Sequence, residues 1–524
     1  MITDIAARFS RRNAVGPVIV SAFVAACVFG GSVQAQPKGS AVMALPALSQ
    51  NFDPTAIVSL ADYMVYEAVF DGLLNLTDKG KEPALAESWT VSPNGLQIDF
   101  KLRQNVKFHN GDPFTAEDVK FTFERIVAAD STHSYRRSFI DSLERVEAVD
   151  PHTARFVLKQ PWPVFFTAAR FSLTHIVPKK YYESVGAKGF KEKPIGTGAY
   201  KLAEWKAGEW TRYEANADYW GPKPTVQTVT QRLVAEPFTR FAMIEKGEAD
   251  IAAGVTGALL ERVRANKDLR VILSPYAGTS ALLFNKAEFP QAQDKRVRLA
   301  VAHAINRPSI ATNVIGGVCE VATSMLTPAT FGFLEGIPPV PYDPEKAKAL
   351  LKEAGVAPGT KVPFVYHTQS FAALPGAPQV LEAIAGNLEA VGLSVDRKNY
   401  DTNAWLSMMR SNKANGIYYT PVGTPDDGGE LLNSYFVANA AWTTRSINVP
   451  EYDAIYKEQQ VLVDPEARKK VLQRFAKLES ENFEMVPLFW CATPYAINAK
   501  RVKDWRPGQG AGNYLSLRTI ELQQ

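Results

Sequence analysis

The chain has 524 residues, of which 58 are basic and 54 acidic, so its formal net charge at pH 7 is only +4. A charge this balanced gives no reason to expect a nucleic-acid or membrane-surface partner, because such partners select strongly basic chains or patches. The length exceeds the size at which one hydrophobic core keeps growing, so we expect at least two domains.

Residues 1–35 have the layout of a secretory signal peptide. A basic region comes first, with arginines at Arg8, Arg11 and Arg12. An uncharged apolar stretch follows over 14–30, and Val33-Gln34-Ala35 is a small-residue cleavage site. The apolar run has roughly 17 residues, the lower limit for a membrane anchor, so we predict export with cleavage after Ala35. The alternative is a lipoprotein acylated at Cys27.

The segment from Glu82 to Ile126 carries the clearest local signals. Asn94-Gly95 and Asn110-Gly111 predict tight turns, because Asn and Gly accept the positive φ that a short reversal needs. Between these turns, apolar and polar residues alternate over 96–103, which is typical of a half-buried strand. Thr115 precedes an acidic first turn and predicts the start of a helix that continues to Ile126.

Short helices and strands alternate along the rest of the chain, which indicates an α/β protein. The composition changes near residues 273–278, which suggests a domain crossover. We predict helices over 237–246, 294–306, 343–354, 377–391, 450–463 and 465–482. We predict strands over 41–45, 146–149, 153–158, 393–400, 486–490 and 495–499.

Beyond the signal-like region only two cysteines remain, Cys319 and Cys491. Export makes a disulfide chemically possible, but a large separation in sequence says nothing about proximity. We therefore favour two buried thiols over a disulfide, and pairing stays open as the alternative.

Five segments of the chain, including Glu82–Ile126, have sequences that are recognisable as a set. They are Glu82–Ile126, Pro194–Tyr200, Asn216–Gly221, Lys295–Ala300 with Ala304–Arg307, and Tyr342–Leu351. In this order they resemble the bacterial extracellular solute-binding proteins of family 5, which serve peptide, nickel and opine ABC transporters. The matches extend over nearly all of the chain after residue 35, and five of them in order make the resemblance specific.

The resemblance implies a two-lobe α/β periplasmic-binding-protein fold, type II-like, with an extra subdomain at about 60–190. Lobe I would cover 36–276, lobe II 277–486, and 487–524 would return to lobe I. The crossovers near 275–281 and 485–494 would form a hinge that closes the lobes over a solute. The protein would then be a periplasmic monomer that delivers its solute to a membrane permease with its ATPase.

The resemblance also bears on the ligand. Peptide-binding members pair an Asp with the peptide ammonium, in a segment that here reads 418–427. The matching position is Thr424, and a neutral hydroxyl cannot supply a charge-assisted bond to an ammonium. Asp426 or Asp427 takes that role only if the loop shifts, so ordinary peptide recognition is in doubt.

An acidic ligand is the other implied possibility. Arg136 and Arg137 sit where nickel-binding members place an arginine that holds a chelator's carboxylates, a task suited to the bidentate guanidinium. The implied solute is then an opine-like conjugate, a modified peptide or a metal chelate, and the competing interpretation is two solvated surface arginines. Further candidate ligand-binding residues are Asn51, Thr279, Tyr419, Trp442 and Trp490. Asn51 has an alternative role as a turn cap.

Two other classes remain as alternatives. A secreted hydrolase is disfavoured, because the chain has no Gly-x-Ser-x-Gly elbow, no His-Glu-x-x-His pair and no lysine-bearing phosphate loop. Its six histidines lack metal-ligand spacing, so we expect no metal and no cofactor. A binding protein that reports to a chemoreceptor instead of a transporter is not excluded by the sequence.

Overall fold

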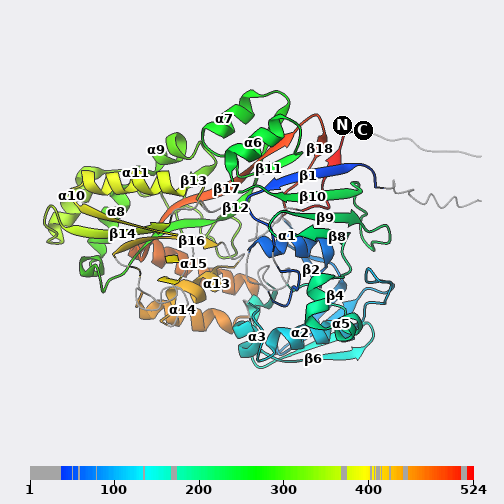
Figure 1. Cartoon of the computed structure of the whole chain (residues 1–524). Helices are drawn as coiled ribbons and strands as arrows, with labels where there is room; N and C mark the ends of the chain where they lie inside the picture. The colour runs from blue at the N-terminus through cyan, green and yellow to red at the C-terminus, as the bar shows by residue number, and fades with distance from the viewer. Residues whose placement is uncertain are drawn as a thin grey trace, which may run out of the picture. The chain divides into compact units, whose positions relative to one another are not determined.

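Figure 1 shows the computed structural model of the chain. It describes residues 37–523 except 50, 57–59, 78–79, 134–135, 167–173, 368–373, 402–403, 406, 409–413, 415, 424–426, 439, 441–446 and 509–515. Helices and strands alternate through the described part, which confirms the α/β class. Within that part, no helix combines the length and the apolar character needed to cross a lipid bilayer.

An eleven-stranded mixed sheet runs through the protein. Its strand order is β15-β14-β16-β12-β17-β11-β1-β10-β9-β8, and β13 pairs with β17 outside this path. In that order the strands are β15 (Ser394–Tyr400), β14 (Lys361–His367), β16 (Ile417–Gly423), β12 (Leu269–Phe284), β17 (Met485–Asn498), β11 (Ile251–Ala253), β1 (Ser40–Leu45), β10 (Thr228–Leu233), β9 (Trp210–Ala215), β8 (Tyr200–Lys206) and β13 (Cys319–Val321).

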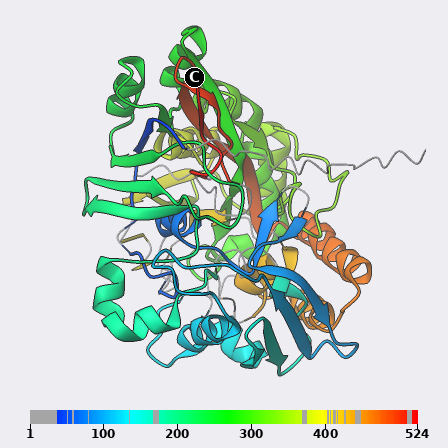
Figure 2. The ribbon, with the colours of Figure 1, turned by 90° about the vertical axis from the view of Figure 1, so that its right-hand side faces the viewer.

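The two long strands β12 and β17 join the halves of this sheet. They run antiparallel from the Leu269–Asn498 pair to the Leu283–Met485 pair, and they lie side by side in both views (Figures 1 and 2). The sequence predicted two separate strands on either side of Pro494, and this was wrong, because β17 is continuous. Pro494 has no N–H to pair, but its carbonyl still accepts a hydrogen bond from the Gly254 N–H at 2.9 Å.

Helices cover both faces of the half that contains β14 and β16. Along β16, Ile417 and Tyr419 pack with α8, α10 and α11, whereas Tyr418 and Val422 lie in the core shared with α14 and α15. Successive side chains of a strand point to opposite faces, so a strand buried on both sides is apolar throughout. The helices are α8 (Lys295–Ala304), α10 (Pro344–Glu353), α11 (Ala377–Ala390), α13 (Gly428–Leu431), α14 (Pro450–Gln460) and α15 (Pro465–Asn482).

The other half of the sheet is covered in the same way. Ala44 and Ala252 pack with α6 and α7, while Met43 and Ile251 share a core with Val69 of α1. The predicted helices and most of the predicted strands are confirmed within a few residues. The remaining elements are α1 (Leu60–Val69), β2 (Leu74–Thr77), β3 (Gly80–Pro83), α5 (Lys179–Glu192), α6 (Pro237–Glu245), α7 (Ala258–Ala265), β18 (Val502–Asp504) and β19 (Glu521–Leu522).

A separate four-stranded sheet lies in the chain between β3 and α5. Its order is β4-β5-β7-β6, and it has its own core with α2 and α3. The predicted turn at Gly95 (φ 70°) joins β4 to β5. The predicted helix start is also confirmed, because α2 begins directly after Thr115, whose N–H donates to Asp118 Oδ2 at 2.9 Å. The elements are β4 (Ala86–Val91), β5 (Gln97–Leu102), α2 (Ala116–Val127), α3 (Arg136–Ser142), β6 (Leu143–Asp150) and β7 (Thr153–Leu158).

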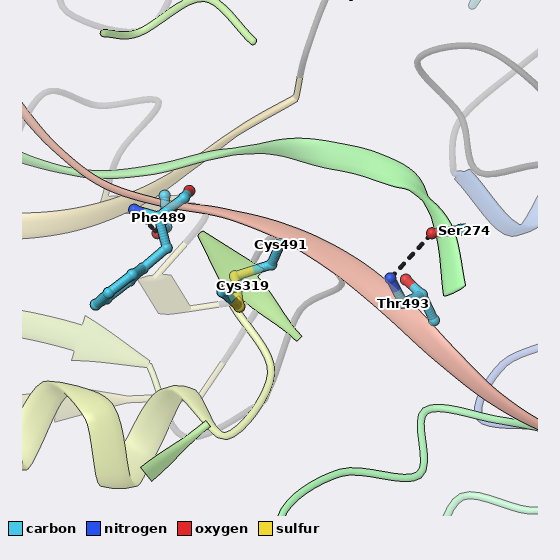
Figure 3. Close-up of a disulfide and its surroundings, with 6 residues drawn as sticks. Ser274, Cys319, Phe489, Cys491 and Thr493 are labelled. Carbon is cyan, nitrogen blue, oxygen red and sulfur yellow. Dashed lines mark hydrogen bonds between the residues drawn. A yellow bond between two sulfur atoms is a disulfide. The ribbon is translucent and has the colours of Figure 1, made fainter. Parts of the chain in front are cut away.

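Cys319 and Cys491 form a disulfide (Figure 3). They are opposite residues of the antiparallel pair β13–β17, with Cα atoms 4.1 Å apart. The favoured prediction of two unpaired thiols was therefore wrong. The pairing of two strands, which brings residues 172 positions apart into register, decides the outcome, and no local signal reports it.

Candidate functional site

The region where β12 and β17 cross between the sheet halves is irregular. Their register shifts between Leu273 and Tyr276, between Tyr276 and Thr279, and again after Ser280. Two serine hydroxyls accept hydrogen bonds from backbone N–H groups of β17 in this region (Figure 3). Ser274 Oγ accepts from the Thr493 N–H at 2.9 Å, and Ser280 Oγ accepts from the Phe489 N–H at 3.2 Å. Such shifts bend strands and re-aim side chains, and they occur often beside functional sites.

Thr279 and Trp490, both predicted as ligand-binding residues, are neighbours in this region. They are opposite residues of β12 and β17. Thr279 is fully buried, and its hydroxyl donates to the Met325 carbonyl at 2.9 Å, so it anchors the 324–326 segment. The Thr279 hydroxyl is therefore already bonded, whereas the Trp490 indole N–H is not, within the described part of the chain.

The indole of Trp490 is surrounded by aromatic and carboxylate groups. Its ring centroid lies 6.3 Å from that of Tyr276 and 5.9 Å from that of Phe333. Glu320 of β13 is its direct cross-strand partner. The residue is 5% exposed, yet its Nε1–H has no hydrogen-bond partner among the residues that the structure describes. Leaving such a buried donor unpaired costs roughly 1–3 kcal/mol, so it calls for an explanation.

Tyr276 and Glu320 interact. Burial is the main cause that raises the pKa of the Tyr276 phenol, and the Glu320 carboxylate adds to the shift. The phenol is therefore protonated at neutral pH and keeps its O–H as a donor. Glu320 is exposed and has no salt bridge in the described part of the chain. Neither Glu320 nor Phe333 was predicted, because contacts between segments far apart in the sequence bring them beside Trp490: the β13–β17 pairing for Glu320 and a ring contact for Phe333.

Arg136 has a structural role in this geometry. Its Nε donates to the Ala128 carbonyl at 2.6 Å and its Nη2 to the Val127 carbonyl at 3.4 Å. These carbonyls lie at the C-terminal end of α2, where helical partners are missing and a cation is favoured. The side chain of Arg137 lies outside the described part.

Asn51 and Tyr419 also serve the fold. The Asn51 side chain accepts from the Asp53 N–H at 3.1 Å and donates to the Ala56 carbonyl, as the alternative role of a turn cap implies. Tyr419 is fully buried in the core with α8 and α11. Burial raises the pKa of its phenol.

Thr424, Asp426 and Trp442 lie outside the described residues. Asp427, the other carboxylate considered for ammonium binding, lies within the described residues and already forms an ion pair with Arg468. It is 2% exposed, both of its oxygens accept from Arg468 at 2.6 Å, and its Oδ1 also caps α13. A carboxylate paired in this way is not available to a solute.

The described residues offer little that points to a metal site or to acid–base catalysis. Among the described residues, no group of three or more His, Cys, Asp or Glu side chains is arranged to hold a metal ion. Burial lowers the pKa of His109 to about 4. The neutral ring bridges backbone groups, since Nε2 lies 3.0 Å from the Gly198 carbonyl and Nδ1 accepts from the Gly196 N–H. His109 therefore has a structural role.

Comparisons with known proteins identify the family of this chain. The model of the bacterial extracellular solute-binding proteins, family 5, matches residues 81–443. Di/tripeptide-binding protein 2 of Pseudomonas aeruginosa (strain UCBPP-PA14) is 29% identical over 503 residues, which is 90% of this chain and 92% of that protein. The glutathione-binding protein GsiB of Shigella dysenteriae serotype 1 is 30% identical over 455 residues, 84% of each chain.

Solved structures show the same two-lobe fold. The substrate-binding protein CtaP of Listeria monocytogenes superposes with a TM-score of 0.83 at 23% identity, over 93% of this chain and 100% of that one. The matched family consists of solute-binding proteins, which excludes the secreted hydrolase that the sequence left as an alternative. The chain belongs to family 5 of the bacterial extracellular solute-binding proteins.

Proposed function

We propose that this protein is the periplasmic receptor of an ABC importer and that its solute is a short peptide or a peptide-like amino-acid conjugate. One observation carries the choice of solute. Two relatives named for binding di/tripeptides and glutathione align over 84% or more of this chain. Peptides and glutathione both present a free α-ammonium, amide groups and carboxylates, so one kind of site suits them.

The charged groups near the candidate site favour this solute over a purely acidic one. The Arg136 guanidinium, expected to hold carboxylates, is bonded to the end of α2. The nearest carboxylate to Trp490 on its strand ladder, Glu320, would repel an anion. An opine-like conjugate or a metal chelate is therefore the second candidate, supported by the sequence resemblance alone.

Capture requires two parts that move, and the proposed lobes are residues 36–276 with 487–524, and 277–486. The β12–β17 pair is the proposed hinge, because its register shifts and serine bridges make it the least regular part of the main sheet. Away from this pair, Val463 between α14 and α15 approaches the β4–β5 turn. Its Cγ2 lies 3.4 Å from where a Cβ on Gly95 would stand. Such a contact breaks when the lobes open.

Export is proposed from residues 1–35 together with the disulfide. A signal peptide would take the chain across the inner membrane, and a disulfide persists in the oxidising periplasm. Delivery to a permease and its ATPase follows from the family, and a chemoreceptor partner is the alternative.

The function is tested with the exported, mature protein. Native mass spectrometry is expected to show a bound small molecule, and thermal unfolding with dialanine, trialanine or reduced glutathione is expected to shift upward. A ligand at about 100 times its Kd stabilises the folded state by roughly 2.7 kcal/mol. No shift with any peptide would contradict the proposed solute class.

The partner is tested separately. Deletion of the gene is expected to abolish growth on the bound peptide as sole nitrogen source. Normal growth with lost chemotaxis towards that peptide would instead support the chemoreceptor role.

A further inference from the structure

We propose that Glu320, Trp490 and Tyr276 form the subsite that receives the N-terminal aminoacyl group of the solute. This inference rests on the proposed function and adds which atoms recognise which end of the peptide. In it, the Glu320 carboxylate accepts from the α-ammonium, and the Trp490 Nε1–H donates to the first carbonyl oxygen.

The strand register brings these groups together. Glu320 and Trp490 are opposite residues of β13 and β17, and opposite residues of an antiparallel pair have Cβ atoms about 4.5–5.5 Å apart on one face. The Cys319–Cys491 bond, one position away, fixes this register covalently. The donor and the acceptor are therefore held on one rigid ladder and not on a mobile loop.

Trp490 supplies the observation that points to a ligand. Its ring is buried against Tyr276 and Phe333, yet its Nε1–H has no partner in the described part of the chain. Native structures pair the large majority of buried side-chain polar atoms. An acceptor on a bound solute would complete this one.

Glu320 supplies the complementary charge. The Tyr276 phenol interacts with it, and a carboxylate has lone pairs for several donors. In the described residues no Lys, Arg or His forms a salt bridge with it. The neighbouring faces of Tyr276 and Trp490 are also favourable for a cation, since aromatic rings attract ammonium groups within about 6 Å.

The pairing of these two groups selects a chemical class. A fixed carboxylate beside a fixed N–H donor matches an ammonium that is one carbon away from a carbonyl. A free peptide N-terminus has this arrangement. A dicarboxylate or a phosphate has no ammonium and would be repelled by Glu320, and an N-acylated peptide lacks the charge.

The test measures binding of dialanine, trialanine and their N-acetylated forms by isothermal titration calorimetry at pH 7. Wild type is expected to bind the free peptides at least about tenfold more tightly than the acetylated ones, the scale of one charged hydrogen bond. Glu320→Gln keeps the shape and removes the charge. It should weaken the free peptides by about tenfold and leave the acetylated ones unchanged.

Two further variants separate recognition from structure. Glu353→Gln, an exposed residue of α10, removes the same charge and should leave every affinity at the wild-type value. Trp490→Phe keeps an aromatic ring and removes the N–H, and should weaken free and acetylated peptides alike, because both retain the carbonyl. The melting temperature without peptide should stay within a few degrees for all three.

The outcomes are distinct. If Glu320→Gln binds free peptides as wild type does, or weakens both forms equally, the subsite assignment is overturned while the peptide receptor stands. If wild type binds neither peptide in either form, and reduced glutathione gives no thermal shift either, the proposed solute class fails and the subsite with it.

Discussion

Glu479 of α15 is a carboxyl group in an unusual place. It is 1% exposed, and its two oxygens have no hydrogen-bond partner among the described residues. Burial raises its pKa to about 8, and the nearby Glu484 carboxylate, itself paired with Lys286 and Arg298, adds to the shift. At neutral pH the group is therefore protonated in the folded protein and ionised in the unfolded chain.

This difference predicts a loss of stability on raising the pH. Between its unfolded pKa near 4.5 and its folded pKa near 8, the folded state binds more protons, so the free energy of unfolding falls by up to about 1.4 kcal/mol per pH unit. Below pH 6.5, two buried histidines with pKa values of about 4, His109 and His133, oppose the trend. Urea unfolding between pH 6.5 and 8 isolates Glu479, and Glu479→Gln should flatten the slope there. A wild-type slope that Glu479→Gln retains would contradict the prediction.

At the scale of elements, an ion pair between the start of α13 and α15 stabilises the segment that follows β16. Asp427 caps α13, and Arg468 of α15 donates to both of its oxygens while its Nε donates to Gln459 of α14. All three side chains are buried. One ion pair therefore ties three helices to the end of β16, where the residue chemistry suggested ammonium binding.

Removing Arg468 should be costly, and a second arginine on the same helix provides the comparison. Arg468→Ala leaves Asp427 buried and uncompensated, which costs about 3–5 kcal/mol of unfolding free energy. Arg474→Ala breaks an exposed pair with Glu458 and should cost less than about 1 kcal/mol. Denaturant unfolding of both variants checks the prediction, and similar losses would refute it.

At the scale of the whole molecule, the disulfide links residues 172 positions apart, and the loop that it closes holds most of the proposed lobe II. A bridge over so long a loop restricts the unfolded chain strongly, and removing it typically costs about 2–5 kcal/mol. Reduction of the folded protein should therefore lower the denaturant midpoint. The Cys319→Ala/Cys491→Ala double variant should begin at the lower midpoint and show no response to reductant. An unchanged wild-type midpoint after complete reduction would show that the bridge adds no stability.

Local chemistry explains what could be predicted. The β4–β5 turn follows from Asn94-Gly95, the start of α2 from Thr115 and Asp118, and the helices of the second half from their apolar periodicity. Each of these signals acts within a few residues of its effect, because turns and caps satisfy backbone groups nearby. The resemblance to the family also lies in such segments, and the comparisons confirmed it.

The candidate site depends on contacts of another kind. The β12–β17 ladder pairs residues about 200 positions apart and sets Thr279 beside Trp490. The β13–β17 pairing sets Glu320 beside both Trp490 and the disulfide. Helix packing likewise commits Asp427 to Arg468, 41 positions away. The sequence by itself determined the class of protein and the elements of its fold, because those are written in short-range patterns. Only the tertiary structure decided which polar groups are already satisfied and which remain open to a solute, because a hydrogen-bond partner is a matter of distance in space.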